Sequence, residues 1–147
     1  FLADMYDVST EERKERIESL SKRFAMADVL SDRIQSYSHG MRQKIIIMGV
    51  LVHNPPVWVL DEPMTGLDPR SSFLLKEMMR EHADGGNTVF FSTHVLDVAE
   101  KVCDRVAIIN RGQILFCGTL GEMKDHFKKN ESLENIFLEL TDDEKEE

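Results

Sequence analysis

Hydrophobic and polar positions along the first third of the chain follow the spacing of helices. Ser9 and Glu12 have the pattern of a helix N-terminus, and an amphipathic charged helix is expected from there to about Met26. A second run, from Met41 to about Val52, is apolar on nearly every side, which is typical of a buried helix. The pattern therefore predicts a helical beginning to the chain.

Short apolar runs predict strands in the remainder. The segments "VWVL" (57–60) and "TVFFS" (88–92) have the character of buried strands, and "RVAII" (105–109) is joined to "ILFCG" (114–118) by a tight turn that predicts a hairpin. Helices are expected between and after these strands, at about 69–84, 95–102, 119–126 and 132–140. Alternating strands and helices favour an α/β fold with a mostly parallel sheet.

The composition is that of a globular protein. The chain has 147 residues, of which 41% are hydrophobic and 31% charged, with a net charge of −9. This acidity argues against a general nucleic-acid-binding surface. No apolar run approaches the roughly 18 residues that a transmembrane helix needs.

Two adjacent carboxylates follow the first predicted strand. In "VWVLDEP", Asp61 and Glu62 come where the strand ends, and ligands of α/β sheets bind beyond the carboxyl ends of strands. Mg²⁺ is a natural partner for Asp61 in a phosphate site, and Glu62 could orient or deprotonate a water. An ordinary turn at a strand end would carry the same two residues, and this alternative stays open.

Two further stretches could contact phosphate. Thr93 and His94 follow the second strand, where the imidazole could donate to a phosphate oxygen or could simply be satisfied at a helix start. In "YSHGMRQK" (37–44), Ser38 is a good N-cap and Gly40 permits close backbone approach. A helix N-terminus attracts anions, although a plain cap would look the same.

The order of these elements carries more information than any one of them. Ser38 comes 23 residues before Asp61, and His94 comes 32 residues after Glu62. In this arrangement the chain resembles, over nearly its whole length, the ATPase domain of ATP-binding cassette (ABC) transporters. "YSHGMRQK" resembles the signature motif, "VWVLDEP" the Walker B strand, "MTGLD" (64–68) the D-loop, and His94 the switch histidine. Within the family, the ATPases of bacterial ABC-2 type exporters are the most similar.

The resemblance implies a partial P-loop NTPase (RecA-like) core at 41–127, a helical signature subdomain at 1–40, and a C-terminal helix with an acidic tail at 128–147. It also implies the cofactors ATP and Mg²⁺. The implied roles are ATP binding in trans for Ser38, His39, Gly40 and Met41, Mg²⁺ binding through water for Asp61, catalysis for Glu62 and His94, and linkage of two sites for Asp68. The implied partners are a second ATPase domain and a membrane permease, at the cytoplasmic face of a bacterial or archaeal membrane.

The signature departs from its commonest form, Leu-Ser-Gly-Gly-Gln. Tyr37, His39 and Met41 replace the Leu, the first Gly and the Gln, while Ser38 and Gly40 are kept. His39 could reach a phosphate or face solvent, and solvent is the favoured interpretation.

No phosphate-loop motif (G-x-x-x-x-G-K followed by Ser or Thr) occurs in these 147 residues. The family places that loop upstream, so the chain resembles the C-terminal portion of an ATPase domain. The resemblance then predicts that a strand is missing between "TVFFS" and "RVAII", and that this chain alone neither binds ATP tightly nor hydrolyses it. The alternatives are a soluble ABC-type ATPase of translation or DNA repair, and a non-catalytic binding module.

Overall fold

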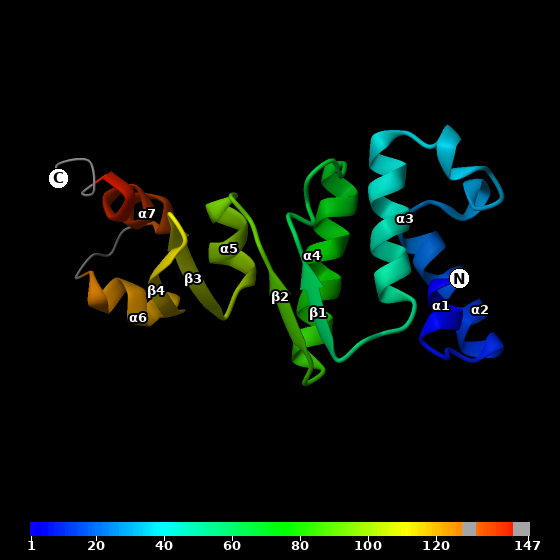
Figure 1. Cartoon of the computed structure of the whole chain (residues 1–147), viewed down its shortest axis with the longest axis horizontal. Coiled ribbons are helices and arrows are strands. Elements are labelled where there is room, and N and C mark those ends of the chain that lie inside the picture. The colour runs from blue at the N-terminus through cyan, green and yellow to red at the C-terminus, as the bar shows by residue number, and fades with distance from the viewer. Residues whose placement is uncertain (128–131, 143–147) are drawn as a thin grey trace. The chain divides into compact units, whose positions relative to one another are not determined.

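The computed structural model describes residues 1–127 and 132–142, which form two compact units. Unit 1 is Phe1–Ser92 and unit 2 is Thr93–Glu147. Figure 1 gives the order of the helices and strands within each unit. The predicted acidic tail (143–147) lies outside the described residues, and the functional division predicted at residues 40 and 127 stays a prediction.

Unit 1 is mostly helical and contains one pair of parallel strands. Its elements are α1 (Leu2–Met5), α2 (Thr10–Arg23), short 3₁₀ turns at Ala27–Val29 and Ile34–Ser36, α3 (His39–Leu51), β1 (Val57–Leu60), α4 (Pro69–Asp84) and β2 (Thr88–Phe91). The helix predicted after Ser9 is confirmed, since the Ser9 hydroxyl accepts the Glu12 N–H at 3.3 Å. The cap predicted at Asp68 is confirmed too, with Pro69 in the first turn of α4.

The prediction that α3 is buried on nearly every side is wrong. Ile47, Met48 and Leu51 are buried, but the side chain of Ile46 is 60% exposed. Helices α1 and α2 both contact α3. The described residues therefore cover only part of its circumference, and the apolar run overstates the burial.

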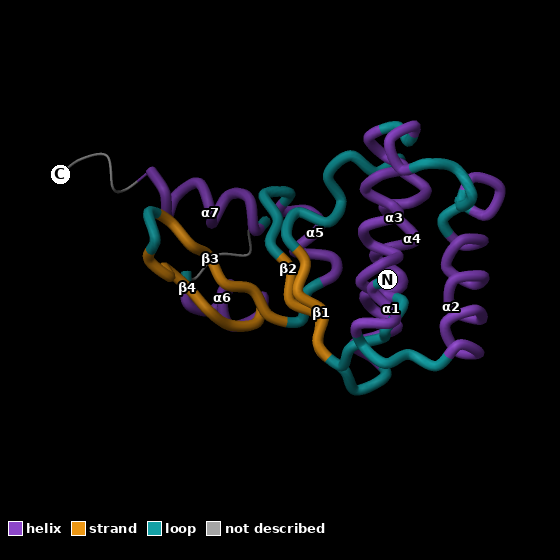
Figure 2. The backbone as a smooth tube through the Cα atoms, turned by 45° about the vertical axis from the view of Figure 1, so that its right-hand side comes forward, coloured by secondary structure: helices purple, strands orange, loops and turns teal. Residues whose placement is uncertain are grey.

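Strands β1 and β2 pair in parallel, from Val57 opposite Thr88 to Leu60 opposite Phe91. Figure 2 shows the two strands side by side. The prediction of a fully buried β1 is wrong, because Trp58 and Leu60 are buried while Val59 is 69% exposed. Side chains alternate between the two faces of a strand, and only one face of this pair is covered.

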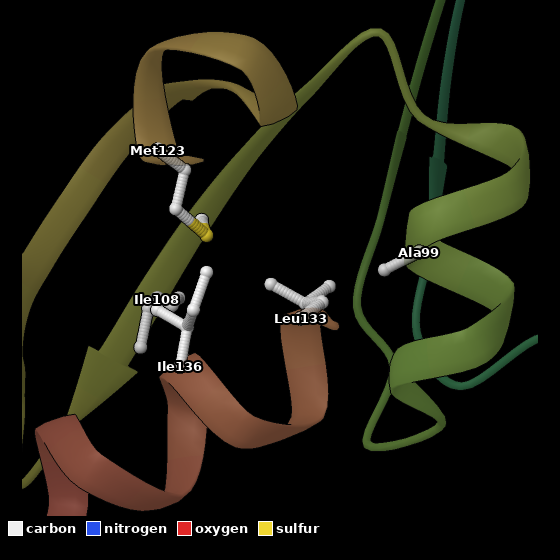
Figure 3. Close-up of a cluster of buried hydrophobic side chains, with 5 residues drawn as sticks. All are labelled: Ala99, Ile108, Met123, Leu133 and Ile136. Carbon is white, nitrogen blue, oxygen red and sulfur yellow. The ribbon is translucent and has the colours of Figure 1, made fainter. Parts of the chain in front are cut away.

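Unit 2 is built around an antiparallel hairpin. Its elements are α5 (Leu96–Val102), β3 (Arg105–Asn110), β4 (Gln113–Thr119), α6 (Leu120–His126) and α7 (Leu133–Asp142). The predicted hairpin is confirmed by the β3–β4 pairing, and Thr119 and Glu122 form the capping box of α6. Figure 3 shows the buried cluster of this unit, contributed by Ala99, Ile108, Met123, Leu133 and Ile136.

The strands form two separate sheets. β2 belongs to the parallel pair and β3 to the antiparallel pair. The parallel pair, with helices before and after each strand, agrees with the predicted α/β fold. A further strand between β2 and β3 stays a prediction.

Candidate functional site

Ser92, directly after β2, holds the corner where β1 ends. Its N–H donates to the carbonyl of Leu60 at 3.0 Å, which extends the ladder by one residue. Its hydroxyl donates to the Asp61 carboxylate and accepts the N–H of Glu62 at 3.0 Å. One serine therefore orients both positions of the carboxylate pair. Sequence reasoning placed Ser92 at the end of a strand and gave it no role, although the parallel register brings it beside Asp61.

Glu62 has an unusual backbone conformation. Its φ is +43°, in the left-handed region that residues with a side chain seldom adopt. Such conformations cost about 1 to 3 kcal/mol and are found where the surrounding structure enforces them, often at functional sites. Here the Glu62 N–H is bound to Ser92, and its carbonyl accepts the Thr65 N–H at 3.0 Å. The chain thus reverses direction at the residue that was predicted to be the base.

The N-terminus of α3 is firmly built. The hydroxyl of Ser38 accepts the N–H of Met41 at 3.3 Å, and Ser38 itself is exposed. Tyr37, which replaces the usual Leu, is 3% exposed, and its hydroxyl donates to the carbonyl of Val29 at 2.6 Å. Arg42 donates to the Tyr37 carbonyl at 3.0 Å. The aromatic residue thus anchors the turn, while Ser38 and the following N–H groups remain at the surface.

The 61–68 loop lies against this helix start. A Cβ placed on Gly40 would be 3.1 Å from the carbonyl oxygen of Gly66, so Gly40 permits a close backbone approach. Gly66 has φ +79°, and a Cβ there would be 2.6 Å from Nε2 of His39. The His39 residue is exposed, as expected, but its ring also lies against Gly66. Its contact with a phosphate stays a prediction.

Asp68, at the end of the same loop, is bound by three donors. Its carboxylate accepts the N–H of Ser71 at 3.0 Å and the Ser71 hydroxyl at 2.7 Å. The ammonium group of Lys44, from α3, lies 2.8 Å from Asp68 Oδ2. The Lys44 bond and the Ser71 bonds together hold the pKa of the Asp68 carboxyl far below its usual value. Lys44 was not among the predicted site residues, because nothing local in the sequence links it to Asp68.

His94 belongs to unit 2, whereas the other predicted site residues belong to unit 1. It is exposed and lies just before α5, where the Thr93 hydroxyl accepts the N–H of Val95 at 3.0 Å. The structure thus brings together the α3 N-terminus and the 61–68 loop. The convergence of His94 with Glu62 on one ligand stays a prediction.

The site suits a hydrated magnesium ion better than a fully protein-bound metal. Among the described residues there is no cluster of three or more His, Cys, Asp or Glu side chains that could hold a metal. Asp61 is an exposed carboxylate already oriented by a hydroxyl. Mg²⁺ commonly takes one or two protein carboxylates and keeps several waters, so Asp61 fits such an ion.

These features define the class of protein. A parallel strand pair with carboxylates at its carboxyl end, beside a capped helix N-terminus, is consistent with a partial P-loop NTPase fold. A solved structure described as the ATP binding subunit of an ABC transporter matches with a TM-score of 0.91 and 34% identity, over 95% of this chain and 59% of that one. The likeness thus covers both the fold and the sequence.

Sequence comparisons specify the family. The family model described as ABC transporter matches residues 1–65. The ABC transporter ATP-binding protein NatA of Bacillus subtilis is 36% identical over 94% of this chain and 56% of its own length. The ABC-type transporter ATP-binding protein EcsA of the same organism is 38% identical, over 92% of this chain and 56% of its own length. The daunorubicin/doxorubicin resistance ATP-binding protein DrrA of Streptomyces peucetius is 38% identical over 80% of this chain and 36% of its own length.

The chain is a homologue of the ATP-binding proteins of ABC transporters. It spans about half the length of the curated relatives it matches most fully. In the described parts of the chain, no helix is both long enough and apolar enough to cross a bilayer.

Proposed function

We propose that this chain is part of the ATP-hydrolysing subunit of an ABC transporter, and that the complete protein couples ATP binding and hydrolysis to transport through a membrane permease. The observation that carries the proposal is the joint position of the α3 N-terminus and the 61–68 loop, in contact through Gly40 and Gly66 and through Lys44 and Asp68. This contact brings an exposed helix start close to a carboxylate-bearing loop, which is what a site for a metal-bound phosphate needs.

The proposed roles divide between two copies of the protein. Ser38 and the N–H groups that follow, at His39, Gly40 and Met41, would bind the terminal phosphates of an ATP held by the other copy. This role uses the free N–H groups and the dipole of α3. Asp68, at the start of α4, would link the two sites of the dimer.

The carboxylate corner would act on the chain's own nucleotide. Asp61 would hold Mg²⁺ through water, and the ion would neutralise charge on the phosphates. Glu62 would accept a proton from the attacking water, a role for which the left-handed turn and the Ser92 bond fix its backbone. His94 would donate to the terminal phosphate.

The 147-residue chain by itself is expected to be inactive. It contains no phosphate-loop sequence, and that loop supplies much of the electrostatic stabilisation in phosphoryl transfer. Hydrolysis by the purified 147-residue chain that disappeared in its Glu62→Gln variant would contradict this part of the proposal.

The proposed partners are a second copy and a permease at the cytoplasmic face of a membrane. Residues 1–37 would help to dock the membrane subunit. The name of DrrA describes resistance to two drugs, and likeness to it supports an exporter. The transporter relatives favour this function over a soluble ABC-type ATPase.

The test is hydrolysis of Mg·ATP by the full-length protein. We expect Glu62→Gln to lower kcat about 10²- to 10⁴-fold, the usual contribution of a general base. Glu77→Gln is the matched control, because Glu77 is an exposed residue of α4 outside the site. Equal rates for wild type and Glu62→Gln would overturn the role of Glu62, and no hydrolysis by wild type would overturn the proposed function.

A further inference from the structure

Lys44 connects the N-terminal ends of two helices that are distant in sequence. Its ammonium group lies 2.8 Å from Asp68 Oδ2, and its side chain is only 15% exposed. The same oxygen accepts the Ser71 hydroxyl at 2.7 Å, and Oδ1 accepts the Ser71 N–H at 3.0 Å. Asp68 is therefore held in a single orientation by donors from both α3 and α4.

Stability alone does not explain why a lysine is largely buried here. The Asp68 side chain is 48% exposed, and ion pairs with an exposed partner contribute little to folding. An Asn or a Ser would cap α4 nearly as well without any cation. Ordering a long lysine side chain also costs conformational entropy. What the pair adds is a fixed distance between the start of α4 and α3.

The 61–68 loop is fixed at both of its ends. Near its beginning, Ser92 binds the N–H of Glu62, and at its end Lys44 binds Asp68. In between, the backbone at Gly66 approaches Gly40 in the first turn of α3. A change at the α3 N-terminus would thus be transmitted to the loop through two contacts, at Gly66 and at Asp68.

We propose that Lys44 is a positioning residue for ATP hydrolysis: by binding Asp68 it holds the 61–68 loop against the α3 N-terminus, so that the phosphate-binding turn and the carboxylate corner keep one geometry. This inference rests on the proposed function. It assigns no contact between Lys44 and the nucleotide.

The test uses four variants of the full-length protein. Lys44→Met keeps the length of the side chain without its charge, and Lys44→Arg keeps a cation. Asp68→Asn can still cap α4. Lys101→Met is the control, because it breaks an exposed ion pair of similar length, 2.8 Å to Asp97, in unit 2. Melting curves establish that each variant is folded.

We expect Lys44→Met to lower kcat about 10- to 100-fold, the scale of a small misplacement of reacting groups. The KM for ATP should change little, since Lys44 does not bind substrate, and Lys44→Arg should recover most of kcat. Adding Lys44→Met to Asp68→Asn should cause no further loss. Wild-type kcat in Lys44→Met, equal to that of Lys101→Met, would overturn the inference.

A second measurement does not depend on hydrolysis. The N–H groups of Thr65 and Leu67 are bonded inside the loop, at 3.0 and 3.2 Å to the carbonyls of Glu62 and Met64. Their hydrogen exchange should be faster in Lys44→Met than in wild type and unaffected by Lys101→Met. If wild type hydrolyses no ATP, the proposed function fails, and this exchange experiment alone judges Lys44. Unchanged exchange would then overturn its positioning role.

Discussion

The two units use their strands in opposite ways. In unit 1 the parallel strands leave one face uncovered, with Val59 and Phe90 more than 60% exposed, and end in a polar corner around Ser92. In unit 2 the antiparallel hairpin packs on a core in which Met123 and Ile136 are at most 2% exposed. The comparison teaches that unit 2 is organised around packing, whereas unit 1 combines packing with an oriented set of polar groups. Four changes test this difference, from the largest expected effect to the smallest.

Deleting a core side chain should have the largest effect, and only in its own unit. Leu75 is 0% exposed in unit 1 and Ile136 is 2% exposed in unit 2, so Leu75→Ala and Ile136→Ala should each cost about 2 to 5 kcal/mol. Trp58 is the chain's single tryptophan and lies in unit 1. In urea, Leu75→Ala should therefore shift the fluorescence transition, while Ile136→Ala shifts mainly the circular dichroism. Identical shifts of both signals in both variants would show that the chain unfolds as one unit.

The turn at Gly66 should be more sensitive than a matched turn in unit 2. Gly66 and Gly112 have φ of +79° and +80°, so an added side chain costs about 1 to 2 kcal/mol at either position. Only Gly66 has the His39 ring in the way, which should add about 0.5 to 1.5 kcal/mol if the ring is forced off its rotamer.

Urea unfolding of Gly66→Ala and Gly112→Ala measures this difference. The excess cost at Gly66 should disappear when His39→Ala is combined with Gly66→Ala. Equal costs for the two single variants would mean that the His39 ring moves aside freely.

The helix caps should separate the units by a smaller margin. Thr119→Ala and Asp68→Ala each remove an N-cap, worth about 0.5 to 2 kcal/mol. Asp68→Ala should be the costlier of the two, because it also leaves the largely buried Lys44 without its carboxylate. Thermal unfolding measures both, with Asp68→Asn as the variant that keeps the cap. A larger loss for Thr119→Ala would argue that the Lys44–Asp68 pair adds nothing.

The smallest effect should be on pH dependence. The Lys44 and Ser71 bonds lower the pKa of Asp68, and the Thr119 N–H is the main cause of the lowered pKa of Glu122. A carboxyl whose pKa is lower in the folded state stabilises the fold above its usual pKa, about 4, and loses that contribution as pH falls below it.

Lys44→Met removes the largest of the bonds that lower the Asp68 pKa. Its urea midpoint should therefore fall less than that of wild type between about pH 6 and pH 3. The difference should be small because Asp68 is half-exposed. A steeper acid loss in Lys44→Met than in wild type would contradict this sign.

The predictable parts of the molecule are those fixed by neighbours in the sequence. The caps at Ser38, Asp68 and Thr119 each depend on a residue three positions away, and all three were expected. What could not be predicted depends on distant contacts. Ser92 reaches residues 30 and 31 positions back, and the exposed face of β1 depends on which elements cover the sheet. The Lys44–Asp68 pair is of the same kind.

The central claim is that the α3 N-terminus serves a nucleotide held by a second copy of the protein. Ser38→Asp and Ser38→Asn test it as a pair, since Asp and Asn cap helices about equally well and only Asp adds a charge that repels phosphate. Both are made in the full-length protein together with Glu62→Gln, which should keep ATP from being hydrolysed, and the molar mass is followed by light scattering.

On adding Mg·ATP, we expect the mass of the Glu62→Gln protein to double. The Ser38→Asn form should dimerise more tightly than the Ser38→Asp form, which should stay close to the mass of one copy. A mass that does not respond to Mg·ATP, or equal dimerisation of the Asp and Asn forms, would contradict the claim.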